Sequence, residues 1–257
     1  MGDREKELQD LLDSVAAQEG DPATVVVLAQ GVTLPHLRNG GVGVELPENL
    51  GIPGGRNAGV RWLREHGGVD VVLILDDDGL LPQTDTLRLL REAFTATPRL
   101  GIVGFRIADE DGISQRRHVP HLGGAALVSG PVTTFLGGAH AIRMQVIDEV
   151  GDFPTQFFYA HEETDFASRA LDTGWGIDYR ADLVLTHPRT EAARHTVYYR
   201  NTGRNRVWLA KRHLPAVLVP VAVYTLVSCA GNGDSKLVGC LYVVSGSSCC
   251  RSRAVRR

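Results

Sequence analysis

The chain has 257 residues, of which 43% are hydrophobic and 22% are charged, and its formal net charge is -3. This balance is typical of a globular protein that buries one large core or two small ones. The nearly neutral charge gives no reason to expect a nucleic-acid partner. Residues 1–18 are charged and helical in pattern, unlike a secretory signal, so we expect the folded part to work in the cytoplasm.

The pattern of apolar residues along the chain predicts strands separated by helices. Asp3 is the expected cap of a first helix that carries Leu8, Leu11, Leu12 and Val15 on its apolar positions. Such alternation indicates an α/β fold with a largely parallel sheet and helices on both faces. The expected strands are residues 24–28, 42–46, 69–75, 101–107, 176–179 and 183–186; the further helices are residues 55–65, 84–95, 143–150 and 162–173, and residues 109–133 form a loop.

Three consecutive carboxylates, Asp76, Asp77 and Asp78, follow the run from Val69 to Leu75. Apart from its second residue, the run consists of Val, Leu and Ile, which predicts a strand buried on both faces. Ligands of open α/β sheets bind at the carboxyl ends of such strands, and a divalent cation offsets the repulsion between neighbouring carboxylates. The alternative is a solvated turn that leads into a helix near Thr84.

A glycine-rich segment, residues 49–59, leads into the expected helix at residues 55–65. Gly51, Gly54 and Gly55 allow close backbone approach, and a helix N-terminus favours an anion such as a pyrophosphate. The alternative is a tight turn that needs glycine only for positive φ. The spacing fits neither the Rossmann fingerprint nor the P-loop.

Acidic residues open the expected helix at residues 162–173. The helix dipole favours carboxylates at this end, so a purely structural role would explain them. The functional alternative is a general base that points into a cleft. Because Glu162 and Glu163 should repel each other, the pKa of either could be raised, which suits a base. Asp165 and Arg169 are four residues apart and should form an ion pair on one helix face.

His187 follows a predicted strand and precedes Pro188. A lone histidine is more often structural than a metal ligand, but this one should lie at the sheet edge where the carboxylates gather. A histidine beside two aspartates suits manganese somewhat better than magnesium. Further on, a basic and aromatic helix is expected from Tyr198 to Trp208.

The last part of the chain differs in composition. Residues 214–227 are apolar but short for a membrane span and are interrupted by Pro215 and Pro220. Because basic residues precede this segment, it could lie at a membrane surface, or it could pack on the domain. We therefore expect one domain at residues 1–213 and, at residues 214–257, an apolar segment and tail that is membrane-associated or disordered. The tail holds all four cysteines without a zinc-ligand spacing: Cys229, Cys240, Cys249 and Cys250.

Five motifs in this order resemble family 2 glycosyltransferases. They are residues 49–59, the strand end at Asp76 to Asp78, the turn at residues 135–139, residues 150–154, and the Glu162-Glu163-Thr164-Asp165 helix start with Arg169. The resemblance covers roughly Asp3 to Pro215. It implies the GT-A fold, which has a mixed, mostly parallel sheet, and metal-dependent, inverting transfer of a sugar from a nucleoside-diphosphate sugar to a hydroxyl acceptor. The acceptor would be a glycan, a lipid-linked molecule or a secondary metabolite. The chain resembles bacterial rhamnosyltransferases in particular, which would imply a cell-envelope polysaccharide, and a lipid-linked acceptor would suit the inner face of the membrane.

The resemblance also implies roles for single residues. Glu163 takes the place of the catalytic base, and Mg²⁺ or Mn²⁺ would be held by Asp76, Asp78 and His187. The implied donor-binding residues are Asn49, Gly54, Arg56, Asn57, Asp76, Asp77, Gly137 and Gly138, and the implied acceptor-side residues are Glu162, Asp165 and Arg204.

The chain departs from the family pattern at three places. The family normally begins with a strand that contacts the nucleobase, and this chain starts after it, so we expect the natural reading frame to begin upstream of Met1. Gln30 lies where many members have a base-binding aspartate, and Glu163 replaces the commoner aspartate. Two other functions are therefore weighed: a nucleotidyltransferase, and a catalytically impaired remnant that binds sugar nucleotides.

Overall fold

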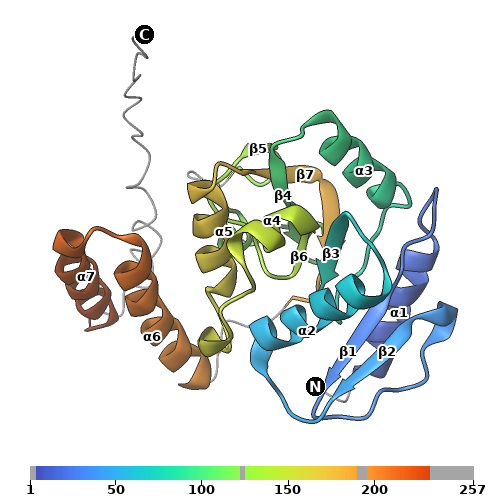
Figure 1. Ribbon diagram of the computed structural model, residues 1–257, viewed down its shortest axis with the longest axis horizontal. Helices are drawn as coiled ribbons and strands as arrows, with labels where there is room; N and C mark the ends of the chain where they lie inside the picture. The colour runs from blue at the N-terminus through green and yellow to red at the C-terminus, as the bar shows by residue number, and fades with distance from the viewer. Residues whose placement is uncertain (1–3, 122–124, 190–195, 232–257) are drawn as a thin grey trace, which may run out of the picture. The chain divides into compact units, whose positions relative to one another are not determined.

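The computed structural model describes residues 4–121, 125–189 and 196–231. The chain forms two compact units, Met1–Asn205 and Arg206–Arg257. Figure 1 labels the elements in chain order: α1 (Glu5–Ala16), β1 (Val26–Gln30), β2 (Val42–Leu46), α2 (Gly51–His66), β3 (Val71–Leu75), α3 (Thr86–Ala96), β4 (Leu100–Ala108), β5 (Gly130–Pro131), β6 (Ala139–Arg143), α4 (Met144–Val150), α5 (Glu162–Asp172), β7 (Gly176–Thr186), α6 (Thr196–His213) and α7 (Val219–Gly231).

The first unit contains a five-stranded mixed sheet in the order β3-β6-β4-β7-β5. Strand β6 is antiparallel to both β3 and β4, and β7 is parallel to β4. It follows that β3, β4 and β7 run in the same direction, which confirms the predicted mixed α/β architecture. Strands β1 and β2 form a separate parallel pair, with Val26 opposite Val42.

Strand β3 is less buried than the predicted strand with both faces in the core. Within the described residues it pairs with β6 alone, so it is the edge of the five-stranded sheet. Val72 is buried, whereas Leu73, Ile74 and Leu75 are only half-buried. The apolar run predicts the strand correctly, but how completely each face is buried depends on the elements that pack over the sheet, and that is a tertiary property.

Three local predictions need correction. Helix α2 begins at Gly51, not near residue 55, so the glycine-rich segment is its first turn. Strand β6 was not predicted, because a five-residue sequence of two alanines, His140, an isoleucine and an arginine has no clear strand pattern. The two strands expected at residues 176–179 and 183–186 are one strand, β7, whose register shifts opposite Phe105 and Arg106.

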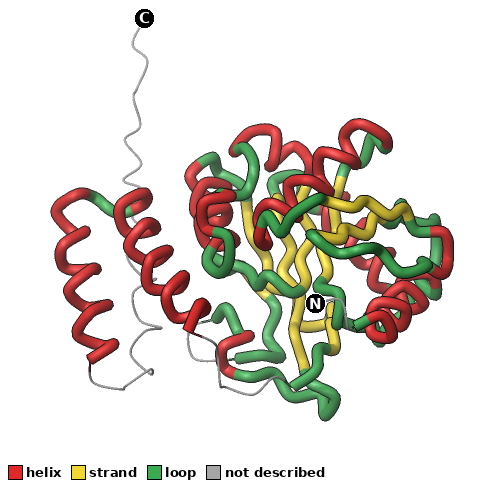
Figure 2. Tube along the Cα trace, turned by 90° about the horizontal axis from the view of Figure 1, so that it is seen from below, coloured by secondary structure: helices red, strands yellow, loops and turns green. Residues whose placement is uncertain are grey.

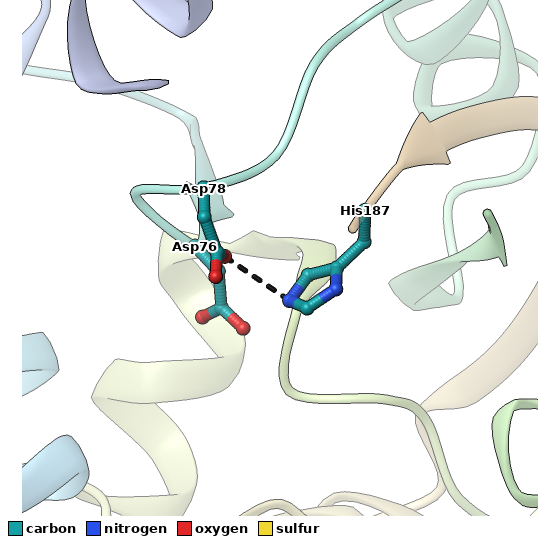
Figure 3. Close-up of side chains that lie close together, drawn as sticks. All are labelled: Asp76, Asp78 and His187. Atoms are coloured by element: carbon teal, nitrogen blue, oxygen red, sulfur yellow. Dashed lines mark ion pairs between the residues drawn. The ribbon is translucent and has the colours of Figure 1, made fainter. Parts of the chain in front are cut away.

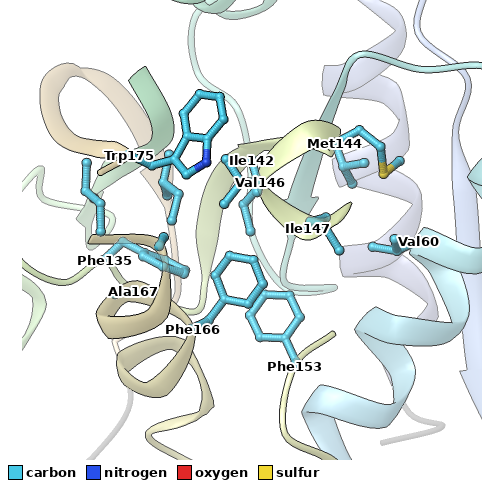
Figure 4. Close-up of a cluster of buried hydrophobic side chains, with 14 residues drawn as sticks. Val60, Phe135, Ile142, Met144, Val146, Ile147, Phe153, Phe166, Ala167 and Trp175 are labelled. Atoms are coloured by element: carbon cyan, nitrogen blue, oxygen red, sulfur yellow. The ribbon is translucent and has the colours of Figure 1, made fainter. Parts of the chain in front are cut away.

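Helices cover both faces of the sheet because neighbouring strand residues point to opposite sides. Ile102 and Ile142 lie in a cluster with residues of α2, α4 and α5, in which the Phe153 and Phe166 rings stack at 4.5 Å (Figure 4). Val103 and Ala141 lie in a second cluster with residues of α3, against which Val15 of α1 packs. Figure 2 shows the strands of the first unit with helices on either side. The predicted layers are thereby confirmed.

Other predictions fall at the ends of the chain. Asp3, the expected cap of α1, and residues 232–257, with three of the four cysteines, lie outside the described residues. None of the described helices combines the length and the hydropathy needed to cross a bilayer. The domain boundary at residue 213 stays a prediction.

Candidate active site

The Asp76–Asp78 segment and His187 follow two strands that run in the same direction, β3 and β7, although β6 and β4 lie between these strands. After Asp78 the chain runs from the end of β3 to the end of β7 and pairs with it. The amide of Leu80 donates to the carbonyl of Thr186 at 2.8 Å, and the amide of Thr186 donates back at 2.9 Å. These two hydrogen bonds bring Asp78 next to His187.

The predicted metal ligands form a cluster, shown in Figure 3. Asp76, Asp78 and His187 each offer one ligand atom, and these atoms lie within 4.8 Å of one another. The Nε2 atom of His187 is 3.0 Å from Oδ1 of Asp78, while its Nδ1 atom is 2.9 Å from the carbonyl oxygen of Pro188. A hydrogen bond to that carbonyl leaves Nε2 directed at the cluster, as in many metal-binding histidines.

Arg4 supplies positive charge to the same carboxylates. Its guanidinium donates to Oδ2 of Asp78 and, at 3.3 Å, to Oδ1 of Asp77. The cluster offers carboxylate oxygens and an imidazole nitrogen, and these ligand atoms fit the preferences of Mg²⁺ or Mn²⁺. The bound guanidinium shows that one of these carboxylates already has a cationic partner. Sequence reasoning missed Arg4, because a lone arginine before a helix carries no functional signal.

The carboxylates of the cluster respond differently to burial. Burial is the main cause that raises the pKa of Asp76, and the charge of Arg56 only partly opposes it. Burial also acts to raise the pKa of Asp78, but the hydrogen bond and charge of His187, together with Arg4, outweigh it and lower that pKa. The pKa of His187 is raised, chiefly by its hydrogen bond to Asp78. The site therefore favours positive charge beside Asp78.

A buried ion pair lies beside this cluster. The Nη1 atom of Arg56, on α2, is 2.8 Å from Oε1 of Glu162, on α5, and their side chains are only 7% and 2% exposed. The Nη2 atom of Arg56 donates to the carbonyl of Gly137 at 2.9 Å. A Cβ atom at Gly137 would lie 2.9 Å from this nitrogen, so glycine permits the close approach. Arg56 thus joins α2, α5 and the turn before β6.

Glu163 is the carboxyl group with the most strongly perturbed proton affinity near the cluster. Burial raises its pKa well above the usual value, and the neighbouring Glu162 raises it further. One buried oxygen of each glutamate, Oε2, has no hydrogen-bond partner within the described residues. A buried carboxyl group with a raised pKa and an unused oxygen is a candidate proton acceptor.

The turn before α5 is strained. Phe158, Ala160 and His161 have φ values of 61°, 70° and 70°, which side chains other than glycine rarely adopt. The Nδ2 atom of Asn205 lies 3.0, 2.9 and 2.7 Å from the carbonyl oxygens of residues 157, 159 and 160. Such strain persists only where surrounding contacts hold it, and it is common at functional sites. Asn205 therefore supports the turn that presents Glu162 and Glu163.

Several predicted site residues have structural contacts. Asn57 holds both the amide and the carbonyl of Phe153 at 2.9 Å, and Asn49 accepts from the amide of Gly51. Their contact with a donor stays a prediction, as does that of Gly54, which is buried in α2.

The acceptor-side residues are also held within the fold. Asp165 is buried and pairs with Arg169 at 3.0 Å, which confirms the expected helix-face pair. Arg204 donates to the carbonyl of Phe157 at 2.8 Å. Gly138, which was predicted on the donor side, lies beside the candidate metal ligands, since a Cβ atom there would be 3.2 Å from Oδ2 of Asp76. Acceptor contacts of Asp165 and Arg204 stay predictions.

The family model described as Glycosyl transferase family 2 matches residues 3–163. The chain belongs to this family. No curated protein matches the sequence. The described fold, with the Asp76–Asp78 segment at the end of β3, is the GT-A fold that the motifs predicted.

Solved structures show the same fold at low sequence identity. TarS from S. aureus is 15% identical with a TM-score of 0.58, and the match covers 87% of this chain and 41% of TarS. The mannosyltransferase PcManGT from Pyrobaculum calidifontis, in complex with GDP-Man and Mn²⁺, is 19% identical with a TM-score of 0.51 over 89% of this chain and 72% of that one. GalNAc-T7 with UDP, GalNAc and Mn²⁺ is 14% identical with a TM-score of 0.59 over 78% and 44%. The chain spans less than half the length of TarS and GalNAc-T7.

Removing Arg4 should strengthen cation binding at the cluster. We expect Arg4→Ala to bind Mn²⁺ about two- to fivefold more tightly than wild type. In wild type, Asp78 must give up a partly exposed ion pair with Arg4 in order to bind the cation, and the variant has no such pair. Isothermal titration with Mn²⁺ measures this change. Arg38→Ala, which removes an arginine that pairs with Asp13 instead, is the control. If wild type and Arg4→Ala bind Mn²⁺ with equal affinity, Arg4 does not compete with the cation for Asp78.

Removing Asn205 should destabilise the strained turn. We expect Asn205→Ala to lower the free energy of unfolding by about 2 kcal/mol, because buried carbonyl oxygens lose their donor. Urea denaturation followed by circular dichroism measures it. Gln145→Ala, which removes an exposed side-chain hydrogen bond to Glu149, should change stability by less than about 0.5 kcal/mol. If both variants behave alike, Asn205 does not hold the turn.

Proposed function

We propose that this protein transfers a sugar from a nucleoside-diphosphate sugar to a hydroxyl acceptor with inversion of the anomeric centre. The observation that supports the proposal is the buried Arg56–Glu162 ion pair, because the charge of Arg56 acts both on Asp76 of the Asp76, Asp78 and His187 cluster and on Glu163, whose pKa is raised. Family membership supports sugar transfer. Solved structures of the same fold hold UDP-GlcNAc or GDP-Man, which supports a nucleotide-sugar donor.

Asp76, Asp78 and His187 are the proposed ligands of a divalent cation. Mg²⁺ or Mn²⁺ would supply the positive charge that stabilises the leaving nucleoside diphosphate. The imidazole ligand suits Mn²⁺ somewhat better than Mg²⁺, and two structures of the same fold contain Mn²⁺. Gly137 and Gly138 would let the donor approach closely, and Asp77 with the start of α2, including Asn49, Gly54 and Asn57, would complete the donor side.

Glu163 is the proposed general base. The acceptor oxygen forms a bond to the anomeric carbon, the bond from that carbon to the diphosphate oxygen breaks, and Glu163 takes the hydroxyl proton. One displacement from the opposite face inverts the configuration, as in inverting hydrolases with water replaced by the acceptor. Arg56 fixes Glu162, whose negative charge raises the proton affinity of Glu163.

The donor and acceptor are proposed from family resemblance. We infer a rhamnose donor and an acceptor of the cell-envelope polysaccharide type, with Asp165 and Arg204 towards the acceptor. The reaction would take place in the cytoplasm, at the inner face of the membrane where the acceptor is lipid-linked.

A catalytically impaired sugar-nucleotide-binding protein is the second candidate. The edge position of β3 favours it, because the strand that carries the aspartates lacks a second neighbour among the described residues. A nucleotidyltransferase would use the cation cluster but has no need of the raised pKa of Glu163. A screen of nucleoside-diphosphate sugars, a rhamnose donor included, for metal-dependent binding and diphosphate release separates the three.

Two substitutions should separate the cation site from the base. Asp78→Ala should abolish metal-dependent donor binding, because it removes a cation ligand. Glu163→Gln keeps the shape but cannot take a proton, so we expect nearly intact donor binding and turnover lowered by roughly two to four orders of magnitude. Donor titrations and the release of diphosphate measure the two effects.

The remaining carboxylates of α5 and an exposed glutamate of α2 serve as comparisons. Glu65→Gln should leave both measurements unchanged. Near-normal turnover of Glu163→Gln, with loss in Glu162→Gln or Asp165→Asn, would assign the base to another carboxylate. Full activity in all three would show that the helix start is only a capped N-terminus.

The pH dependence should report the pKa of Glu163. Since the base must be deprotonated, kcat/KM should fall at low pH with a midpoint above that of an ordinary glutamate. Glu162→Gln removes a neighbouring negative charge and should move the midpoint to lower pH, whereas Glu65→Gln should not.

Stability gives a second measurement of the same pKa. A raised folded-state pKa means that the stabilising contribution of Glu163 is present at low pH and is lost as pH rises through that value. Glu163→Gln cannot ionise, so its free energy of unfolding should exceed that of wild type at alkaline pH and approach it at low pH. An unmoved midpoint in Glu162→Gln and a pH-independent stability difference would contradict the assignment.

A further inference from the structure

The second unit exposes one apolar helix face. The short 3-10 turn Ala216–Leu218 leads directly into α7. Val217, Val221 and Tyr224 are 78%, 60% and 74% exposed, and they are spaced at i, i+4 and i+7, which places them on one side of a helix. Leu218 is also exposed, whereas Ala222 is buried. We call Val217, Leu218, Val221 and Tyr224 the apolar face.

Positive charge adjoins the apolar face in the sequence. The exposed residues Lys211 and Arg212 lie in the last turn of α6, shortly before Pro215. Residues 192–233 contain six Lys or Arg and neither Asp nor Glu. Exposed apolar residues scattered singly are normal, but several on one helix side, with basic residues shortly before them in the sequence, indicate a partner surface that is both apolar and anionic.

We propose that the apolar face, together with Lys211 and Arg212, binds the surface of a membrane that contains anionic lipid. A helix with one apolar face and basic residues lies in the bilayer interface with that face among the lipid chains. Basic side chains gain from the surface potential of anionic lipids, and an aromatic residue such as Tyr224 suits the headgroup region.

Charge argues against the other occupants of this face. A second copy of this face would offer no acidic partner to Lys211 and Arg212 in a two-fold interface, because residues 206–231 contain neither Asp nor Glu. Residues 232–257 carry five Lys or Arg and one Asp, so they offer no acidic complement either. Membrane binding does not depend on sugar transfer, although it would bring the chain to a lipid-linked acceptor.

Vesicle flotation tests the proposal. The full chain should float with vesicles of phosphatidylcholine and phosphatidylglycerol, and bind vesicles of phosphatidylcholine alone at least about tenfold more weakly. High salt should weaken binding. Val217→Asp with Val221→Asp should abolish flotation, and Lys211→Glu with Arg212→Glu should lower affinity at least about tenfold. Circular dichroism checks that each variant keeps its fold.

Matched variants decide the result. Leu127→Asp replaces a residue that is 77% exposed in the first unit, and Lys6→Glu with Arg61→Glu reverses two exposed charges elsewhere; both should float like wild type. The proposal is overturned if wild type does not float, or if the matched variants lose binding equally.

A second copy of the chain would be the occupant under a different result. In that case wild type would be a dimer that does not bind vesicles, and Val217→Asp with Val221→Asp would convert it to a monomer. Diphosphate release in detergent-free solution reports the proposed function separately.

Discussion

The first unit is organised by the need to balance negative charge at one edge of its sheet. Asp76, Asp77 and Asp78 follow β3, and Glu162 and Glu163 open α5. Removing carboxylates from water costs several kcal/mol per ion unless positive charge and hydrogen bonds compensate. Arg56 is the most buried of the compensating groups, and its charge acts on Asp76 as well as on Glu162 and Glu163. Where compensation is strong, as at Asp78, the pKa falls; where burial wins, as at Glu163, it rises. This difference would allow one carboxylate to hold a cation and another to accept a proton.

The fold holds these charges with backbone contacts that have little role of their own in chemistry. The Leu80 and Thr186 hydrogen bonds bring two non-adjacent strand ends together. Asn205 holds the left-handed turn before α5. Gly137 lets Arg56 reach the main chain. The first two contacts fix charged side chains through the backbone that carries them, and the third lets a carbonyl bind the Arg56 guanidinium directly. A substitution at Asn205 is therefore expected to alter the site without touching a substrate.

The two units have opposite electrostatic characters. Carboxylates dominate the candidate active site, whereas the described part of the second unit contains no acidic residue. An acidic centre that held a divalent cation would suit a diphosphate donor, and a basic, apolar surface suits anionic lipid. A glycosyltransferase with both surfaces could meet a water-soluble donor and a membrane-bound acceptor, each through complementary chemistry.

The sequence by itself determined the elements whose signals are local. The strand at residues 42–46, the helix start at Glu162, the pair of Asp165 with Arg169 and the aspartates at a strand end all follow from periodicity, helix-face spacing or motif. Only the tertiary structure decided that β3 is an edge, that β6 inserts between β3 and β4, and that Arg56 reaches Glu162 across 106 residues and Arg4 reaches Asp78 across 74. Such contacts depend on which strands become neighbours and on where burial leaves a charge in need of a partner. Neither property is encoded in a short window of residues, because both arise from the packing of distant segments.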